Sequence, residues 1–268
     1  MMEVLYRSRM GNGLLNRLAR SRVTNLAGRF MDSRASRLLI RPFVRMNRLD
    51  LSDYPSGPWN SFNEFFTRPV LSGRRPIQTG DEVFVSPSDG YARALVITPG
   101  GELMVKGKPC TIEALLDDPA LAARYAGGWC VVVRLAPDNY HRYCYPTGGT
   151  QRFSRALPGV YHMVRPEALE KHPVYGMNAR EYAVLDTPEF GAVVMIEVGA
   201  LMVGRICNHP VTDRFVKGQE KGYFAFGGST ILLLLEPGAI RLRPELLETG
   251  KTGGELPVRQ GQALGVRP

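Results

Sequence analysis

The chain has 268 residues, 44% of them hydrophobic, and a formal net charge of +9, which suits one large domain or a domain with an appended arm. No apolar stretch approaches the ~20 residues needed to cross a bilayer, and the N-terminus lacks a hydrophobic segment with a small-residue cleavage site, so we expect no secretory signal. The four cysteines form no Cys-x-x-C pair, which argues against a zinc ribbon or redox motif and favours a reducing cytosol.

The positive charge is concentrated at the N-terminus. Residues 1–50 contain eleven arginines and three acidic residues, so they carry a net charge of +8 out of the total of +9. This asymmetry indicates a polyanionic partner, either a membrane surface or nucleic acid. No recognised DNA-binding motif accompanies the basic residues, so we expect no nucleic acid.

Two basic amphipathic helices are predicted in this region, over residues 12–31 and 33–48, with Pro42 as a possible kink in the second. Such helices can lie in the headgroup layer of a membrane with their arginines on anionic lipid. They can also pack on the domain with the arginines in solvent, and both interpretations can hold for different faces.

After the N-terminal region, the sequence pattern changes from one typical of helices to one typical of short β-strands and turns. A turn-rich linker is expected at 53–58, a short helix at 59–70, a second helix at 111–125 with Thr111 as N-cap, and closing strands over 256–265. Further strands are predicted at 83–85, 92–97, 130–135, 193–198, 201–206 and 231–235. The expected fold class is α+β, with N-terminal amphipathic helices on a predominantly antiparallel β core. The expected division is a basic helical, membrane-associating arm with its linker over 1–58 and a β-rich catalytic domain over 59–268.

The segment 222–230 (GYFAFGGST) predicts a strand, a bend at the glycine pair, and then the apolar strand 231–235. Gly-Gly-Ser-Thr is ordinary turn chemistry, and a tight turn with Ser229 in the bend is the simplest interpretation. The alternative is self-processing, in which the Ser229 hydroxyl attacks the carbonyl of Gly228. Glycine has no Cβ to block that approach and tolerates strained dihedrals.

Such a reaction needs a base and a group that orients the base. His141 follows a hydrophobic strand and is one candidate, although a histidine bonded locally in a turn fits as well. His162, in a segment expected to be extended, is an alternative base with the same ambiguity. Asp89 lies in Ser-Pro-Ser-Asp-Gly (86–90), where turn formation is a sufficient explanation.

Seven segments, each a weak signal alone, occur in an order that resembles the phosphatidylserine decarboxylases, the pyruvoyl-dependent enzymes of the GGST type. They are 61–69 (SFNEFFTRP), 86–90 (SPSDG), 105–107 (VKG) with 112–116 (IEALL), 140–142 (YHR), 198–200 (VGA) with 203–204 (VG), 218–222 (GQEKG) and 226–230 (FGGST).

The resemblance implies cleavage between Gly228 and Ser229, giving a large subunit (1–228) and a small one (229–268). Ser229 would become the pyruvoyl group that forms a Schiff base with the substrate amine, and Asp89 the acid of an Asp-His-Ser relay. The resemblance also implies docking of the N-terminal region on an anionic membrane surface, as a peripheral protein at the cytoplasmic face. A homo-oligomer is expected, and neither a metal nor another cofactor.

One position departs from the family pattern Tyr-His-Arg-x-His, because this chain has Tyr-His-Arg-Tyr-Cys at 140–144. Cys144 replaces the second histidine, which is generally regarded as the relay base, whereas His141 matches the first. A neutral thiol is a poor general base. His141 can serve both tasks, His162 can substitute, or processing is slow or absent; we expect His141 to be the base.

The resemblance implies decarboxylation of phosphatidylserine to phosphatidylethanolamine. One alternative is a soluble amino acid decarboxylase with the same chemistry, which the arginine-rich arm argues against. The other is a membrane-binding relative that lost self-processing through Cys144.

Overall fold

A computed structural model describes residues 27–105, 108–160, 174–200, 205–210, 213–226 and 229–268. The fold is built on an eight-stranded sheet in the order β11-β7-β8-β9-β13-β5-β2-β15, and all the neighbouring strands printed for it are antiparallel. In that order, the strands are Arg214–Phe215, Gly149–Leu157, Arg180–Thr187, Gly191–Gly199, Ser229–Leu235, Trp129–Leu135, Gly90–Val96 and Leu256–Val258.

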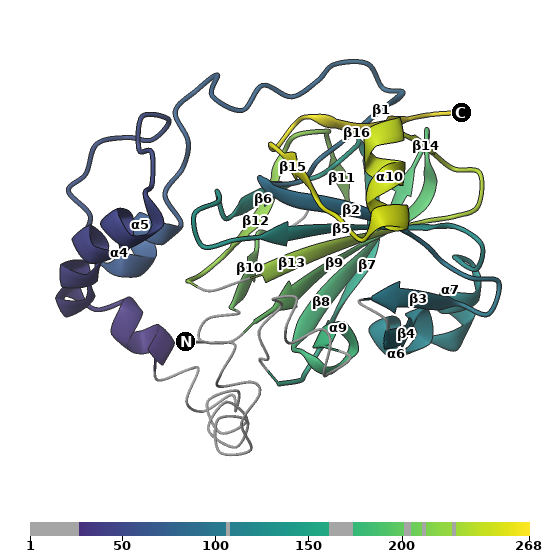
Figure 1. The fold of residues 1–268 in the computed structure, drawn as a ribbon, viewed down its shortest axis with the longest axis horizontal. Helices are drawn as coiled ribbons and strands as arrows, with labels where there is room; N and C mark the ends of the chain where they lie inside the picture. Colours follow the sequence, from purple (N-terminus) through teal and green to yellow (C-terminus); the bar gives the residue numbers. More distant parts are fainter. Residues whose placement is uncertain (1–26, 106–107, 161–173, 201–204, 211–212, 227–228) are drawn as a thin grey trace.

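Both faces of the large sheet are covered (Figure 1). On one face lie two three-stranded sheets, β1-β16-β14 and β10-β12-β6, and Leu246 of helix α10 joins the core there. On the other face lie the β3–β4 hairpin and helices α6, α7 and α9. The bounds are β1 Val83–Val85, β16 Ala263–Val266, β14 Arg241–Leu242, β10 Ile206–Asn208, β12 Glu220–Phe224, β6 Arg142–Cys144, α10 Pro244–Thr252, β3 Glu102–Val105, β4 Lys108–Thr111, α6 Ile112–Leu116, α7 Pro119–Ala123 and α9 Val174–Met177.

The central strand β13 is apolar from Ile231 to Leu235 because it is buried on both sides. Leu232 and Leu234 belong to the core under the helices, whereas Ile231 and Leu233 belong to the core under the small sheets. Side chains alternate between the two faces of a strand. Ser229 is two residues before Ile231, so its side chain points to the same face of the sheet, the one that the small sheets cover.

In the structure, the N-terminal arm extends from residue 27 through α5 (Phe62–Phe66) and lies to one side of this β core (Figure 1). It contains the helical residues 27–31, a 3-10 helix η1 (Arg34–Leu39), α4 (Ile40–Asn47) and α5. Its interior is an aromatic cluster formed by Phe43, Phe62, Phe65 and Phe66 with Met31. Phe226, from the segment that follows β12, packs against the same cluster. Of the part of the chain that the structure describes, no helix is long and apolar enough to cross a bilayer.

The fold class is confirmed as α+β on a mostly antiparallel core. The division at residue 58 stays a prediction, and residues 12–26 of the first expected helix and 201–204 of one expected strand lie outside the described residues. The second expected helix is present, with a 3-10 first half, and the helix expected over 59–70 is limited to the five residues of α5.

Two expected features differ in the structure. The helix expected over 111–125 is two helices, α6 and α7, because Asp117 takes a left-handed conformation and Asp118 caps a new helix that begins at Pro119. Proline lacks the N–H that an uninterrupted helix would use there. Thr111 is the N-cap of α6, as predicted, and accepts a hydrogen bond from the Ala114 amide at 3.0 Å. Ser229 is the first residue of β13 rather than part of a bend.

Candidate active site

Ser229 is positioned by strand pairing on both sides. It lies opposite Leu135 of β5 and Gly199 of β9. The residue is fully buried, and its Oγ has no hydrogen-bond partner in the structure as described. A buried hydroxyl without a partner costs free energy, about 1–3 kcal/mol, so its placement calls for an explanation. Gly228, on the other side of the expected cleavage site, lies outside the described residues.

The strand register brings Asp89 to the same end of the sheet as Ser229. Tyr91 pairs with Arg134, which precedes Leu135, so the start of β2 is level with the start of β13. Neighbouring strands are about 4.8 Å apart, which puts β2 and β13, two strands apart, about 10 Å from one another. A Cβ on Gly90 would lie 2.6 Å from the Arg134 carbonyl oxygen, so glycine is required after Asp89 for this approach.

The Asp89 carboxylate is held rigidly by an arginine. Arg75 donates from Nε to Oδ1 at 2.8 Å and from Nη2 to Oδ2 at 2.7 Å. The backbone amide of Gln260 also donates to Oδ1, at 2.9 Å. Arg75 also pairs with Asp53 at 2.8 Å, so the segment between α4 and α5 is attached to this site. Asp89 is thus a buried carboxylate with a fixed orientation. Its role in a relay with a histidine stays a prediction.

His141 is buried in the loop between β5 and β6 and has a defined tautomer when neutral. Its Nδ1 lies 2.9 Å from the Asn139 carbonyl oxygen. A carbonyl only accepts, so Nδ1 carries the proton and Nε2 holds the lone pair in the neutral ring. The ring lies 4.1 Å from that of Phe66 in α5, and the His141 carbonyl accepts a hydrogen bond from the Phe224 amide at 3.0 Å. His141 is therefore placed beside the strand that leads to Ser229.

Cys144 is buried on β6, and its amide donates to the Pro87 carbonyl at 2.9 Å, two residues before Asp89. Burial raises the pKa of the Cys144 thiol to about 12. The thiol is neutral near pH 7 and does not act as a base there. His162 lies outside the described residues, so its part as an alternative base stays untested.

A buried ion pair that the sequence analysis did not single out lies on the same face of the sheet. Glu197 of β9 pairs with Ile231, two residues along β13 from Ser229. Its carboxylate contacts Nζ of Lys221 at 2.8 Å, and both side chains are almost completely buried. Burial raises the pKa of Glu197, and Lys221 opposes that shift. The signal in the sequence was a charged residue inside the otherwise apolar run of β9.

The comparisons with known proteins decide the family. The family model described as phosphatidylserine decarboxylase matches residues 62–266. The chain belongs to the phosphatidylserine decarboxylase family. Among its relatives, phosphatidylserine decarboxylase proenzyme 2 of Clostridium acetobutylicum is 36% identical, over 98% of this chain and 91% of the relative. The phosphatidylserine decarboxylase proenzyme of Chlamydia muridarum is 39% identical, over 97% of this chain and 88% of the relative.

Family membership confirms the resemblance seen in the sequence and the expectation that this protein is an enzyme, a decarboxylase. The relatives are named proenzymes, which fits a family whose members are processed. The roles of Ser229, Asp89 and His141 in this chain are not settled by these names.

Proposed function

We propose that this protein decarboxylates phosphatidylserine to phosphatidylethanolamine at a membrane surface after cleaving itself between Gly228 and Ser229. The observation that carries the proposal is the Ser229 hydroxyl, which is fully buried without a hydrogen-bond partner among the described residues and directly follows the glycine pair. A reacting hydroxyl explains why a polar atom is kept in that position.

Self-cleavage starts with attack of Ser229 Oγ on the carbonyl carbon of Gly228. A C–O bond forms and the C–N bond breaks, so the amide becomes an ester and the Ser229 nitrogen becomes an amine. Loss of the Ser229 Cα proton then breaks the Cβ–Oγ bond, and Gly228 leaves as a carboxylate. The elimination leaves a double bond between Cα and Cβ, and this enamine becomes an imine when Cβ takes up a proton and turns into a methyl group. Water then hydrolyses the imine, ammonia departs, and a ketone is left at the start of the small subunit.

His141 is the base in this proposal. Its Nδ1–H is committed to the Asn139 carbonyl, so the neutral ring accepts the hydroxyl proton at Nε2. Asp89 places its carboxyl group at the same end of the sheet, where Arg75 holds it by hydrogen bonds. The buried Ser229 side-chain position fits a pyruvoyl group, since Oγ leaves with Gly228 and the methyl group that remains at Cβ needs no hydrogen-bond partner. When formed, that group supplies an electron sink for an amine substrate.

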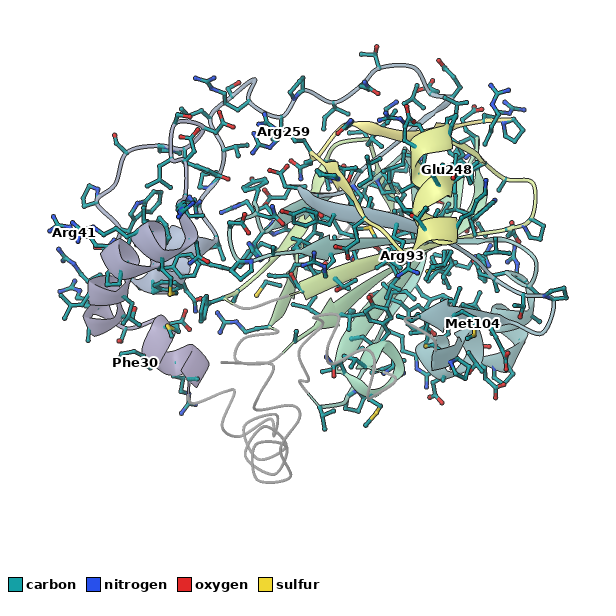
Figure 2. All side chains as sticks on the ribbon, in the orientation of Figure 1. Phe30, Arg41, Arg93, Met104, Glu248 and Arg259 are labelled. Atoms are coloured by element: carbon teal, nitrogen blue, oxygen red, sulfur yellow. The ribbon has the colours of Figure 1, made fainter. Side chains whose placement is uncertain are left out.

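The membrane surface is the second part of the proposal, and the arm supports it. Leu38 and Met46 are 79% and 78% exposed, and Phe30 is 49% exposed. Six exposed arginines accompany them, namely Arg29, Arg34, Arg37, Arg41, Arg45 and Arg48. Figure 2 shows Phe30 and Arg41 on the outer side of the arm, away from the β core. Exposed apolar side chains among arginines suit the headgroup region of an anionic membrane.

The test of self-cleavage is the intact mass of the purified wild-type protein beside Ser229→Ala. We expect two chains from the wild type, with the small one starting at residue 229 and blocked to Edman sequencing, and one whole chain from Ser229→Ala. A wild type that stays whole and inactive contradicts the proposal. If Cys144→His then cleaves, the protein is the unprocessed relative.

The substrate is tested separately on the cleaved enzyme. We expect carbon dioxide release from phosphatidylserine vesicles and little from free serine at the same concentration. The reverse preference would identify a soluble amino acid decarboxylase.

A further inference from the structure

The backbone that leads to Ser229 is held by three different segments at three successive residues. The amides of Phe224 and Ala225 donate to the carbonyls of His141 and Arg205, both at 3.0 Å. The next amide, that of Phe226, donates to the side-chain Oδ1 of Asn63 in α5, also at 3.0 Å. Among these three, the hydrogen bond nearest the glycine pair is therefore accepted by a side chain of the N-terminal arm, Asn63.

Asn63 is itself fixed in one orientation. Its Nδ2 donates to Oδ1 of Asp32 at 2.7 Å, and Asp32 also pairs with Arg205 at 3.5 Å. An ionised carboxylate only accepts hydrogen bonds, so Asp32 must face the amide nitrogen and Oδ1 must face Phe226. The Asn63 side chain is 6% exposed, so water does not easily replace these bonds.

The same helix packs on the ring of Phe226 and on His141. The Phe226 ring lies 4.7 Å from Phe62 and 5.1 Å from Phe66, both of α5, and 6.0 Å from Phe43 of α4, each edge to face. Phe66 also contacts the His141 ring at 4.1 Å. Helix α5 thus fixes both the chain before the cleavage site and the proposed base.

We propose that Asn63 is a positioning residue for self-cleavage. The backbone of Ser229 is fixed by pairing with β5 and β9, and the backbone of Phe226 is fixed by its hydrogen bond to Asn63. In the sequence, only Gly227 and Gly228 lie between these two fixed residues. Holding both ends restricts the approach of the Gly228 carbonyl to the hydroxyl, and such restriction accelerates an intramolecular attack. This inference rests on the proposed function.

The experiment follows self-cleavage of the full chain over time by mass spectrometry. In Asn63→Asp, the new carboxylate faces Asp32, and we expect cleavage slowed on the order of tenfold. The exchanged pair Asn63→Asp with Asp32→Asn restores a donor opposite an acceptor, so it should recover most of the rate. Asn63→Ala, which adds no charge but leaves the Phe226 amide unpaired, should be slowed about threefold to tenfold. Asn60→Asp, the same change at an exposed neighbour, is the control and should cleave like the wild type.

Circular dichroism and thermal midpoints of each variant, in the Ser229→Ala background, separate positioning from loss of folding. Cleavage of both Asn63→Asp and Asn63→Ala at the wild-type rate overturns this inference alone. So does a slow exchanged pair that is folded and as stable as the wild type. A wild-type chain that never cleaves overturns the proposed function together with this inference.

Discussion

The residue that distinguishes this site from its family pattern is Cys144, and its environment decides what it can do. The side chain is 1% exposed, and burial raises the pKa of its thiol to about 12. A raised pKa means that less thiolate is present at any given pH. In the proposed self-cleavage, the proton of Ser229 would therefore pass to a group other than Cys144, and His141 has the tautomer that suits this role.

We predict that Cys144 resists alkylation. At pH 8, a thiol with a pKa of about 12 is thiolate in only about one molecule in ten thousand, so iodoacetamide should leave it unmodified in the folded protein. The partly exposed Cys207 is the internal comparison and should be labelled. Peptide mass mapping before and after denaturation checks both sites, and rapid native labelling of Cys144 would contradict the buried, neutral thiol.

At the scale of elements, the small sheet that carries β12 is joined to the large sheet by the ion pair between Lys221 and Glu197. Lys221 also donates to Asn208 Oδ1 at 2.9 Å, and the same oxygen accepts from the Tyr143 hydroxyl at 2.9 Å. A buried ion pair is weak evidence for stability by itself, but removing one partner leaves an uncompensated charge. The pair therefore fixes the position of the strand that precedes the cleavage site.

We predict that Lys221→Met lowers the free energy of unfolding by about 3–5 kcal/mol, because Glu197 is left buried without its partner. The double variant Lys221→Met with Glu197→Leu should recover much of the loss. Urea denaturation in the Ser229→Ala background gives the values on one uniform chain. Lys251→Met, which removes an exposed partner of Glu248, is the control and should change stability by less than about 1 kcal/mol. An equal loss in the control and in Lys221→Met would show that burial of the pair is not the cause.

Particular elements show why part of the fold could be predicted from the sequence and part could not. Apolar strands such as β5 and β13 were predicted because both of their faces are buried, which makes the hydrophobic run continuous. Strand β7 was missed because most of its residues are exposed, so its hydrophobic pattern is weak. Helix α10 was missed although Pro244 at its start and Gly253 after its end are ordinary helix boundaries. Ser229, Asp89 and His141 were predicted from motifs, and their roles stay predictions. The hydrogen bonds that Arg75 and Asn63 make to Asp89 and Phe226 could not be predicted, because they join different segments of the chain.

On the scale of the whole molecule, the arm lies between the proposed membrane-binding surface and the candidate active site around Ser229. Its outer side carries exposed arginines and apolar residues, and its inner side supplies the aromatic cluster that packs on Phe226. The helices of the arm therefore present one side to the proposed membrane, whereas the aromatic residues on the other side contact Phe226 before Ser229. The sequence predicted the basic amphipathic character of the arm, but not its contact with residues more than 160 positions away.

The arm leads to a prediction on vesicles. We expect the protein to float with vesicles containing anionic phospholipid and much less with zwitterionic vesicles, and added salt should weaken the binding because it screens the arginines.

The double change Leu38→Ser with Met46→Ser removes two exposed apolar side chains from the arm. It should lower the partition coefficient by about tenfold or more, since each side chain inserted in the bilayer contributes about 1 kcal/mol or more. Met104→Ser is the matched control, because Met104 is 51% exposed on β3 and lies on the side of the molecule opposite the arm (Figure 2). Equal loss of binding in the control, or equal binding to both kinds of vesicle, would show that this face of the arm is not the membrane contact.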